Sequence, residues 1–481
     1  MTATATSSTM RAARAAAAFA VATALAAACG CDAPYQQFLG SIPTDEVDPD
    51  APVEVFLGID GLSKQAFDMA RARGAFADYH AADLITPFPG TSDYSWTRTL
   101  RAGALGGYEL QYFDPQANTM ENRGLVGVAE HPLREGIADT LPAYQRFDFL
   151  GDGETWMLDS YLDPVASLRP TLDQMFDTVA ARGRTKSRVM AYLLNVDVVG
   201  HLGGRDQAVA MLIEIDRRIR AFKADHRRRF QFTLFADHGN AHQRSRLVDP
   251  VQILTDVGIT SVDALSASAA ADATAPPLEA VAVVHVRVNY VALHAARDNV
   301  VDIAARTSRH PYVDLAVARL ADDAGGAQRF GIWRQGVVHR FSRDATGTIV
   351  VDDPDAWCWL GMDFGPWRDA AGATAKLTDR QAFDATVSGP YPDVFYRVAT
   401  AFTHAATRFP ADILLSMPDD VASFGFAVPG AVVDVRAADG FHGALSRAST
   451  LSVVASDSKP LPPAVRSDEL ADMFPMLRGA Q

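Results

Sequence analysis

Cysteine is scarce in this chain, whose 481 residues contain three: Cys29, Cys31 and Cys358. So few cysteines exclude a disulfide framework. Positive charge is also in deficit, because 44 Lys and Arg face 58 Asp and Glu and leave a formal net charge of −14. This balance argues against a nucleic-acid-binding surface, which needs basic residues to displace counterions. It suits a protein that collects metal cations through carboxylates.

Long apolar runs are missing beyond the N-terminus, so no later segment is predicted to cross a bilayer. The N-terminus itself has Arg11 and Arg14 ahead of a small-residue apolar stretch, Ala15–Ala28. This pattern is typical of an export signal and is too short for a spanning helix. We therefore expect a signal peptide over residues 1–28.

Cys29 directly follows this stretch and resembles the lipidated cysteine of a bacterial lipoprotein. The usual Leu three places earlier is here Ala26, so a plain secretory signal is the alternative. Residues 29–51 then read as a flexible tether. We expect an exported, periplasmic protein that is either anchored to the outer membrane through a lipid on Cys29 or secreted, with no other membrane contact.

The body of the chain alternates short apolar strands with helical stretches, and its hydrophobic content of 48% allows a sizeable core. This alternation predicts an α/β fold, a three-layer sandwich with a central, mostly parallel sheet covered by helices on both faces. The strands are expected over 53–59, 82–85, 190–196 and 230–235, and the helices over 64–73, 172–181 and 206–224. The expected divisions are a main domain over 52–457, a smaller inserted region over 330–390 near the active site, and a C-terminal tail over 458–481.

Acidic residues follow three of the predicted strands: Asp60, Asp197 and Asp237. A parallel sheet brings the carboxyl ends of its strands to one edge, so we expect these carboxylates to meet. Each motif alone also fits an ordinary turn or a surface position, and the prediction depends on their combination.

Three histidines complete this set, with His201 four residues after Asp197, His238 next to Asp237, and His442 near the C-terminus. Three carboxylates and three imidazoles suffice for two divalent cations. Mixed nitrogen and oxygen ligands favour zinc, with manganese or iron as alternatives. Two cations about 4 Å apart suit in-line displacement at phosphorus.

A hydroxyl-rich segment, Thr91-Ser92-Asp93, precedes a predicted helix. The N-terminus of a helix favours phosphate, and a cation beside a hydroxyl would make it a nucleophile at neutral pH. The alternative is a simple helix cap, which Ser, Thr and Asp all fill well.

Taken in order, these motifs resemble the alkaline phosphatase superfamily, most closely its type I phosphodiesterase/nucleotide pyrophosphatase branch. The resemblance spans about residues 52 to 457. The motifs are Ile59-Asp60-Gly61, Phe88-Pro89 through Ser95, Asp197 with Gly200-His201, Asp237-His238-Gly239 and His442-Gly443.

The resemblance implies an exported hydrolase that cleaves small-molecule phosphate esters, diester or monoester, through a phosphoserine. It implies Ser92 as nucleophile, because Ser95 follows three positions later, with Thr91 as second choice. By the same likeness, Asp197, His201 and His442 would hold one metal ion, and Asp60, Asp237, His238 and the Ser92 oxygen would hold the other.

The chain departs from the branch in its nucleophile, which is usually Thr, and in Tyr192, which stands where monoesterases carry a glutamate for a third metal. The substrate-binding Asn of the branch has only Asn118 as a substitute. Two alternatives stay open: a phosphoryl or head-group transferase (or mutase) on the same scaffold, and a non-catalytic binding lipoprotein.

Overall fold

The computed structural model describes residues 51–121, 143–151, 156–226, 230–266, 278–285, 288–323, 325–423 and 439–478. The expected export signal over 1–28, and the expected tether apart from Ala51, lie outside the described residues. Among the described helices, none combines the length and apolar character needed to cross a bilayer.

A six-stranded sheet in the order β19-β2-β18-β6-β1-β5 forms the core of the first lobe. β1 pairs in parallel with β5 and β6, and β2 with β19, whereas β18 runs antiparallel to both β2 and β6. The strands are β1 (Val53–Ile59), β2 (His80–Ile85), β5 (Arg188–Leu193), β6 (Phe230–Phe235), β18 (Leu451–Ser456) and β19 (Ala464–Arg466). The predicted mostly parallel sheet is therefore confirmed.

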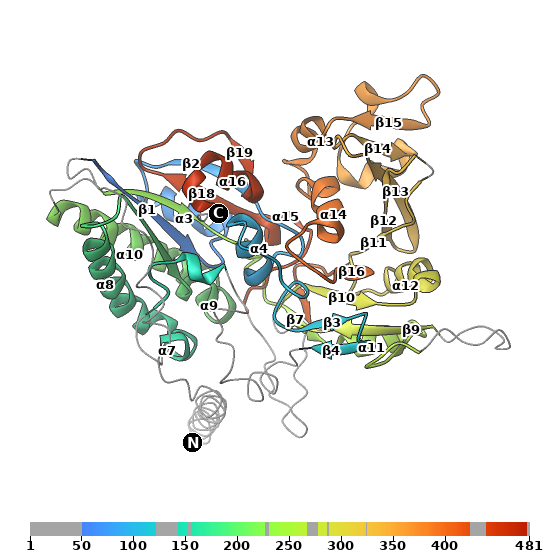
Figure 1. Cartoon of the computed structure of the whole chain (residues 1–481), viewed down its shortest axis with the longest axis horizontal. Helices are drawn as coiled ribbons and strands as arrows, with labels where there is room; N and C mark the ends of the chain where they lie inside the picture. Colours follow the sequence, from blue (N-terminus) through green and yellow to red (C-terminus); the bar gives the residue numbers. More distant parts are fainter. Residues whose placement is uncertain are drawn as a thin grey trace, which may run out of the picture.

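Helices cover both faces of this sheet because its strands are apolar on both sides. In β1, Val55 and Leu57 enter one core, while Phe56 between them enters another. The first core is shared with α3 (Lys64–Ala72), α8 (Pro164–Arg182) and α10 (Gly204–Asp225). The second core is shared with α4 (Ser92–Thr99) and α16 (Ser467–Met473). The three-layer α/β/α architecture is confirmed (Figure 1).

A second sheet of nine strands forms a lobe beside the first (Figure 1), in the order β15-β14-β13-β12-β11-β16-β10-β9-β8. Its strands are β8 (Thr260–Ser261), β9 (Glu279–Val283), β10 (Tyr290–His294), β11 (Leu315–Arg319), β12 (Gln328–Arg334), β13 (Val337–Arg343), β14 (Ile349–Asp352), β15 (Thr374–Leu377) and β16 (Ile413–Ser416). Its helices are α11 (Pro250–Asp256), α12 (Val300–Thr307), α13 (Asp379–Thr386) and α14 (Val394–Thr403).

This lobe is larger than the inserted region expected over 330–390. β16 lies between β10 and β11 and pairs with both, so strands far apart in the chain share one sheet. Pairing between segments so distant leaves no local pattern in the sequence.

The segment expected as a C-terminal tail over 458–481 also differs from the prediction. β19 pairs with β2, and α16 packs beside α4, with Val465 and Leu470 buried in the core. A strand of three residues is too short for its periodicity to be recognised.

The remaining described elements are short or connect the sheets. They are β3 (Tyr112–Asp114), β4 (Thr119–Glu121), β7 (Arg246–Val248), β17 (Val421–Ser423), α7 (Trp156–Leu162), α9 (Asn195–Leu202), α15 (Arg447–Thr450), and the 3-10 turns Tyr144–Arg146, Arg297–Asn299, Pro354–Leu360, Gly365–Trp367 and Pro475–Leu477.

Arg397 on α14 hydrogen-bonds the second lobe to the segments that precede and follow the predicted site residues. Its side chain is 2% exposed and donates to backbone carbonyls from both lobes. The Thr86–Pro87 segment precedes the Ser92 loop, and the Ala444–Leu445 segment follows His442. The N···O distances are 2.8 Å to Thr86, 3.0 Å to Leu445, 3.3 Å to Pro87, 3.4 Å to Pro392 and 3.4 Å to Ala444.

Replacing this guanidinium should destabilise the protein strongly, because the carbonyls it binds would lose buried donors. We expect Arg397→Met to lower the free energy of unfolding by about 3–5 kcal/mol in urea denaturation. The matched control is Arg380→Met on α13, where the arginine side chain is 64% exposed and pairs with Asp384. That change should stay within about 0.5 kcal/mol. Equal losses in the two variants would contradict the role given to Arg397.

Candidate metal centre

The structure brings all seven predicted site residues together beside the carboxyl ends of β1, β5 and β6. Asp60 directly follows β1, and Asp237 lies two residues after β6. Asp197 and His201 lie one turn apart on α9, which begins after β5, so their side chains share one face of the helix. In each of two sets of three residues, the ligand atoms all lie within 4.8 Å of one another. The sets are Asp197, His238 and His442, and Asp60, Asp237 and His238.

The distances place His201 in the same centre, with its Nε2 3.1 Å from Oδ2 of Asp197. The rings of His238 and His442 are stacked with centroids 3.5 Å apart. His238 therefore lies between Asp197 on one side and Asp60 with Asp237 on the other, close to both ligand sets that the resemblance implies.

Two of the three carboxylates are bound by the protein through one oxygen while the other is turned inward. Oδ2 of Asp60 accepts from the hydroxyl of Tyr192, and its Oδ1 lies 3.2 Å from Nε2 of His238. Oδ1 of Asp237 accepts from the amide of Gly61 at 3.2 Å. Oδ2 of Asp237 and Oδ1 of Asp197 are buried and have no hydrogen-bond partner in the described part of the chain.

Gly61 makes this arrangement possible because it combines a φ of +64° with close contact to α9. A Cβ at this position would lie 2.5 Å from Oδ1 and 2.8 Å from Cβ of Asp197. Only glycine allows both this backbone conformation and this approach.

The three imidazoles are fixed in one tautomer by the backbone. Each Nδ1 lies within hydrogen-bond distance of a carbonyl, and because a carbonyl can only accept, Nδ1 must carry the proton. In its neutral form each ring therefore presents the lone pair of its Nε2, the arrangement seen in metal-binding histidines. The N···O distances are 2.7 Å from His201 to Gly440, 2.8 Å from His238 to Gly239, and 2.8 Å from His442 to Gly90.

The negative charge of the three buried carboxylates favours binding of a cation. Within the described part of the chain, the ion pairs of Asp60, Asp197 and Asp237 involve only histidines. Burial and the charge of Asp60 raise the pKa of Asp237 well above its usual value. Burial would lower the pKa of His238, but the charge of Asp237 and the hydrogen bond with Asp60 raise it to about 10.

These properties fit divalent metal ions of the zinc type. The unpartnered carboxylate oxygens and the three Nε2 lone pairs form a mixed oxygen and nitrogen donor set, buried and without Lys or Arg among the described contacts. A purely structural cluster would be expected to satisfy its buried carboxylate oxygens with donors.

The structure distinguishes the two candidate nucleophiles. Ser92 is the first residue of α4, is partly exposed, and has its Oγ 3.4 Å from Oδ1 of Asp60 and 3.2 Å from Nε2 of His238. The hydroxyl of Thr91 is buried and donates instead to the carbonyl of Tyr108 at 2.8 Å. Ser92 is therefore the hydroxyl that faces the centre.

Glu109 and His285 act on Asp93, the neighbour of Ser92, and were not identified as site residues from the sequence. Glu109 lies 3.2 Å from Nδ1 of His285, and its charge, after burial, helps raise the pKa of Asp93 to about 7. Glu109 lies in a loop without motif context, so only the folded chain shows that its charge acts on Asp93. Asn118, considered as a substrate-binding residue, instead hydrogen-bonds the backbone of Leu265 and does not contact the centre.

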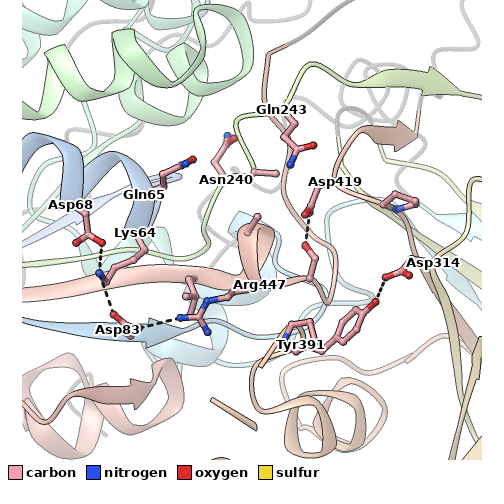
Figure 2. A pocket seen from close by; sticks show the side chains of 16 residues that line it. Lys64, Gln65, Asp68, Asp83, Asn240, Gln243, Asp314, Tyr391, Asp419 and Arg447 are labelled. Carbon is pink, nitrogen blue, oxygen red and sulfur yellow. Dashed lines mark hydrogen bonds and ion pairs between the residues drawn. The ribbon is translucent and has the colours of Figure 1, made fainter. Parts of the chain in front are cut away.

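A cavity of about 780 Å³ lies between the lobes, but none of the seven site residues lines it (Figure 2). Its wall includes Lys64, which pairs with Asp68 and lies 3.5 Å from Asp83. Arg447 lies 3.8 Å from the same Asp83. Because these cations already face carboxylates of the cavity, it is poorly suited to phosphate.

No protein-family model matches the chain, and no curated protein matches its sequence. Among solved structures, human ectonucleotide pyrophosphatase/phosphodiesterase 5 is similar with a TM-score of 0.41 and 9% identity, over 88% of this chain and 93% of that chain. Phosphonoacetate hydrolase from Sinorhizobium meliloti 1021 is similar over 88% of this chain and 94% of that chain. Its complex with phosphonoformate gives a TM-score of 0.39 at 10% identity, and that with phosphonoacetate 0.40 at 11%. Likenesses this weak carry no argument about function, which depends on the contacts of the centre itself.

Adding a methyl group at Gly61 should disrupt the centre more than the fold. We expect Gly61→Ala to weaken zinc binding at least tenfold, because the new Cβ would displace Asp197. The matched control is Gly74→Ala, which also has a positive φ of +91° but no atom within 4 Å of the added Cβ. Gly74→Ala should lose about 1 kcal/mol of stability from backbone strain, and Gly61→Ala should lose more, because its Cβ would also lie 2.9 Å from the Cα of Asp197. Only Gly61→Ala should lose zinc in a competition titration. Unchanged zinc affinity in Gly61→Ala would contradict the placement of Asp197 as a ligand.

Metal binding should stabilise the whole protein, because the bound cation relieves the repulsion between buried carboxylates. We expect saturating zinc to raise the melting temperature of chelator-treated protein by roughly 5 °C. Magnesium should raise it less, since it prefers all-oxygen coordination. A melting temperature that zinc leaves unchanged in differential scanning calorimetry would rule out a zinc centre.

Proposed function

We propose that this chain hydrolyses small-molecule phosphate esters, diester or monoester, through a phosphoserine formed on Ser92 beside two divalent metal ions, with zinc favoured. The observation that carries this proposal is the position of Ser92. Its Oγ lies at the start of a helix and within 3.4 Å of both Asp60 and His238. A nucleophilic hydroxyl at a cation site and at a helix N-terminus is the arrangement that phosphoryl transfer needs.

The first turn of α4 can receive the phosphate. The side chain of Thr91 makes no capping hydrogen bond to this helix, because it donates to Tyr108 instead. The first backbone N–H groups of the helix, together with the positive end of its dipole, are thus available to non-bridging phosphate oxygens.

The proposed reaction has two displacements at phosphorus. In the first, Ser92 Oγ forms a bond to phosphorus while the bond to the alcohol oxygen breaks. The serine gives up its proton to a water molecule, and the alcohol leaves with a proton. In the second, water attacks phosphorus, the bond to Oγ breaks, and Ser92 regains its proton.

The residues of the centre would hold the two ions in place. Asp197, His201 and His442 would hold one, and Asp60, Asp237 and His238, together with the Ser92 oxygen, would hold the other. When bound, such ions supply Lewis acidity and neutralise charge on the phosphate oxygens. Export of the chain and lipidation of Cys29 stay predictions of the sequence.

The nucleophile can be tested with one pair of variants. We expect Ser92→Ala to lower hydrolysis of p-nitrophenyl phosphate and of bis(p-nitrophenyl) phosphate by about 10³-fold or more, with zinc still bound. Thr91→Val, which removes the neighbouring hydroxyl, should change activity by less than about tenfold. Comparing the two esters in the parent protein then gives the preference between monoester and diester.

The other outcomes separate the alternatives. Full activity in Ser92→Ala would exclude the phosphoserine. If the parent binds two zinc ions but hydrolyses neither ester, adding a primary alcohol as acceptor tests for transfer. Absence of both reactions would favour a binding protein.

A further inference from the structure

We infer that Tyr192 is a positioning residue of the metal centre: its hydroxyl holds one oxygen of Asp60 and so leaves that carboxylate a single oxygen for the cation. The inference deepens the proposed function and rests on its metal site, and it does not depend on which ester is cleaved.

The register of the sheet brings Tyr192 to Asp60. Tyr192 on β5 lies opposite Gly58 of β1. Asp60 lies two residues after Gly58, so its side chain is on the same side of the sheet as that position. Gly58 leaves room on this face for the rings of Trp96 and Phe147, which a Cβ there would approach to 2.9 Å and 3.0 Å. Both rings pack against Tyr192, whose hydroxyl contacts Oδ2 of Asp60.

The direction of this hydrogen bond is fixed by chemistry. An ionised carboxylate can only accept, so the Tyr192 hydroxyl must donate to it. A hydroxyl that donates to a ligand orients that ligand without itself being counted among the ligands. Oδ1 of Asp60 is then the oxygen turned toward the centre, 3.2 Å from Nε2 of His238 and 3.4 Å from Oγ of Ser92.

The ring of Tyr192 is itself held in place by aromatic neighbours. It is 3% exposed and makes edge contacts with Trp96, at a centroid distance of 5.9 Å, and with Tyr144, at 5.6 Å. A phenylalanine at this position would keep these ring contacts and lose only the hydroxyl, with its hydrogen bonds to Asp60 and Tyr144.

The donor to Asp60 can be removed by substitution, whereas the donor to Asp237 cannot. One oxygen of Asp237 is also held, but its donor is the backbone amide of Gly61, which no substitution removes cleanly. For Asp60 the corresponding donor is a side chain. Removing a single hydroxyl therefore changes the orientation of one ligand and leaves the ligand set intact.

The test compares Tyr192→Phe with Tyr79→Phe in the full chain. Tyr79 is likewise buried, at 7% exposure, and its hydroxyl has no hydrogen-bond partner among the residues that the structure describes. Zinc affinity is measured by titrating zinc into chelator-treated protein against a competing chromogenic chelator. We expect Tyr192→Phe to weaken one of two zinc sites by about 10–100-fold and to leave the other within about threefold. Tyr79→Phe should change neither site.

A double-mutant cycle with Asp60→Asn provides the second measurement. If Tyr192 acts through Asp60, adding Tyr192→Phe to Asp60→Asn should cause no further loss of zinc affinity. Unchanged affinity in Tyr192→Phe, or full additivity with Asp60→Asn, would overturn the inference. Equal weakening of both sites together with a lower melting temperature of the metal-free protein would show a packing role instead.

These outcomes are distinct from a failure of the proposed function. A parent protein that binds two zinc ions and cleaves no ester would refute the hydrolase, while the affinities of Tyr192→Phe would still decide the role of Tyr192. A parent protein that binds no zinc would overturn both.

Discussion

The burial of three carboxylates around one histidine, His238, is the constraint on which the rest of this structure depends. Asp60, Asp197 and Asp237 are at most 6% exposed, and their described ion pairs include no Lys or Arg. Charges this close in a poorly solvated site are costly unless protons or cations balance them. The protein provides three imidazoles whose neutral form offers a lone pair but no positive charge. Divalent ions are therefore suited to balance the negative charge of the carboxylates.

The two lobes position the residues of the metal centre in different ways. The mostly parallel sheet delivers the carboxylates, because β1, β5 and β6 end at the same edge. His442 comes from a segment far along the chain, whose following carbonyls, at Ala444 and Leu445, bind Arg397 of the second lobe. The same guanidinium binds the segment leading to Ser92. One buried arginine thus joins the nucleophile loop, the last imidazole and the second sheet.

Much of the first lobe and its centre could be predicted from the sequence, because both rest on local patterns. The sequence itself shows apolar strands that are followed by Asp60 and Asp237. It also shows the four-residue spacing of Asp197 and His201. The resemblance already favoured Ser92 over Thr91, and the structure adds the physical reason, because the Thr91 hydroxyl donates to Tyr108. The size of the second sheet could not be predicted, because β16 inserts between β10 and β11 through pairing at long range. The role of Tyr192 likewise depends on the register between β1 and β5.

The most direct test of the account is a crystal structure of zinc-soaked protein with anomalous diffraction measured on both sides of the zinc edge. The account predicts two peaks about 4 Å apart, one against Asp197, His201 and His442 and the other against Asp60, Asp237 and His238. It also predicts that Oδ1 of Asp60, and not the oxygen bound by Tyr192, contacts the second ion. No peak at these residues, or a peak only at other sites, would contradict the account.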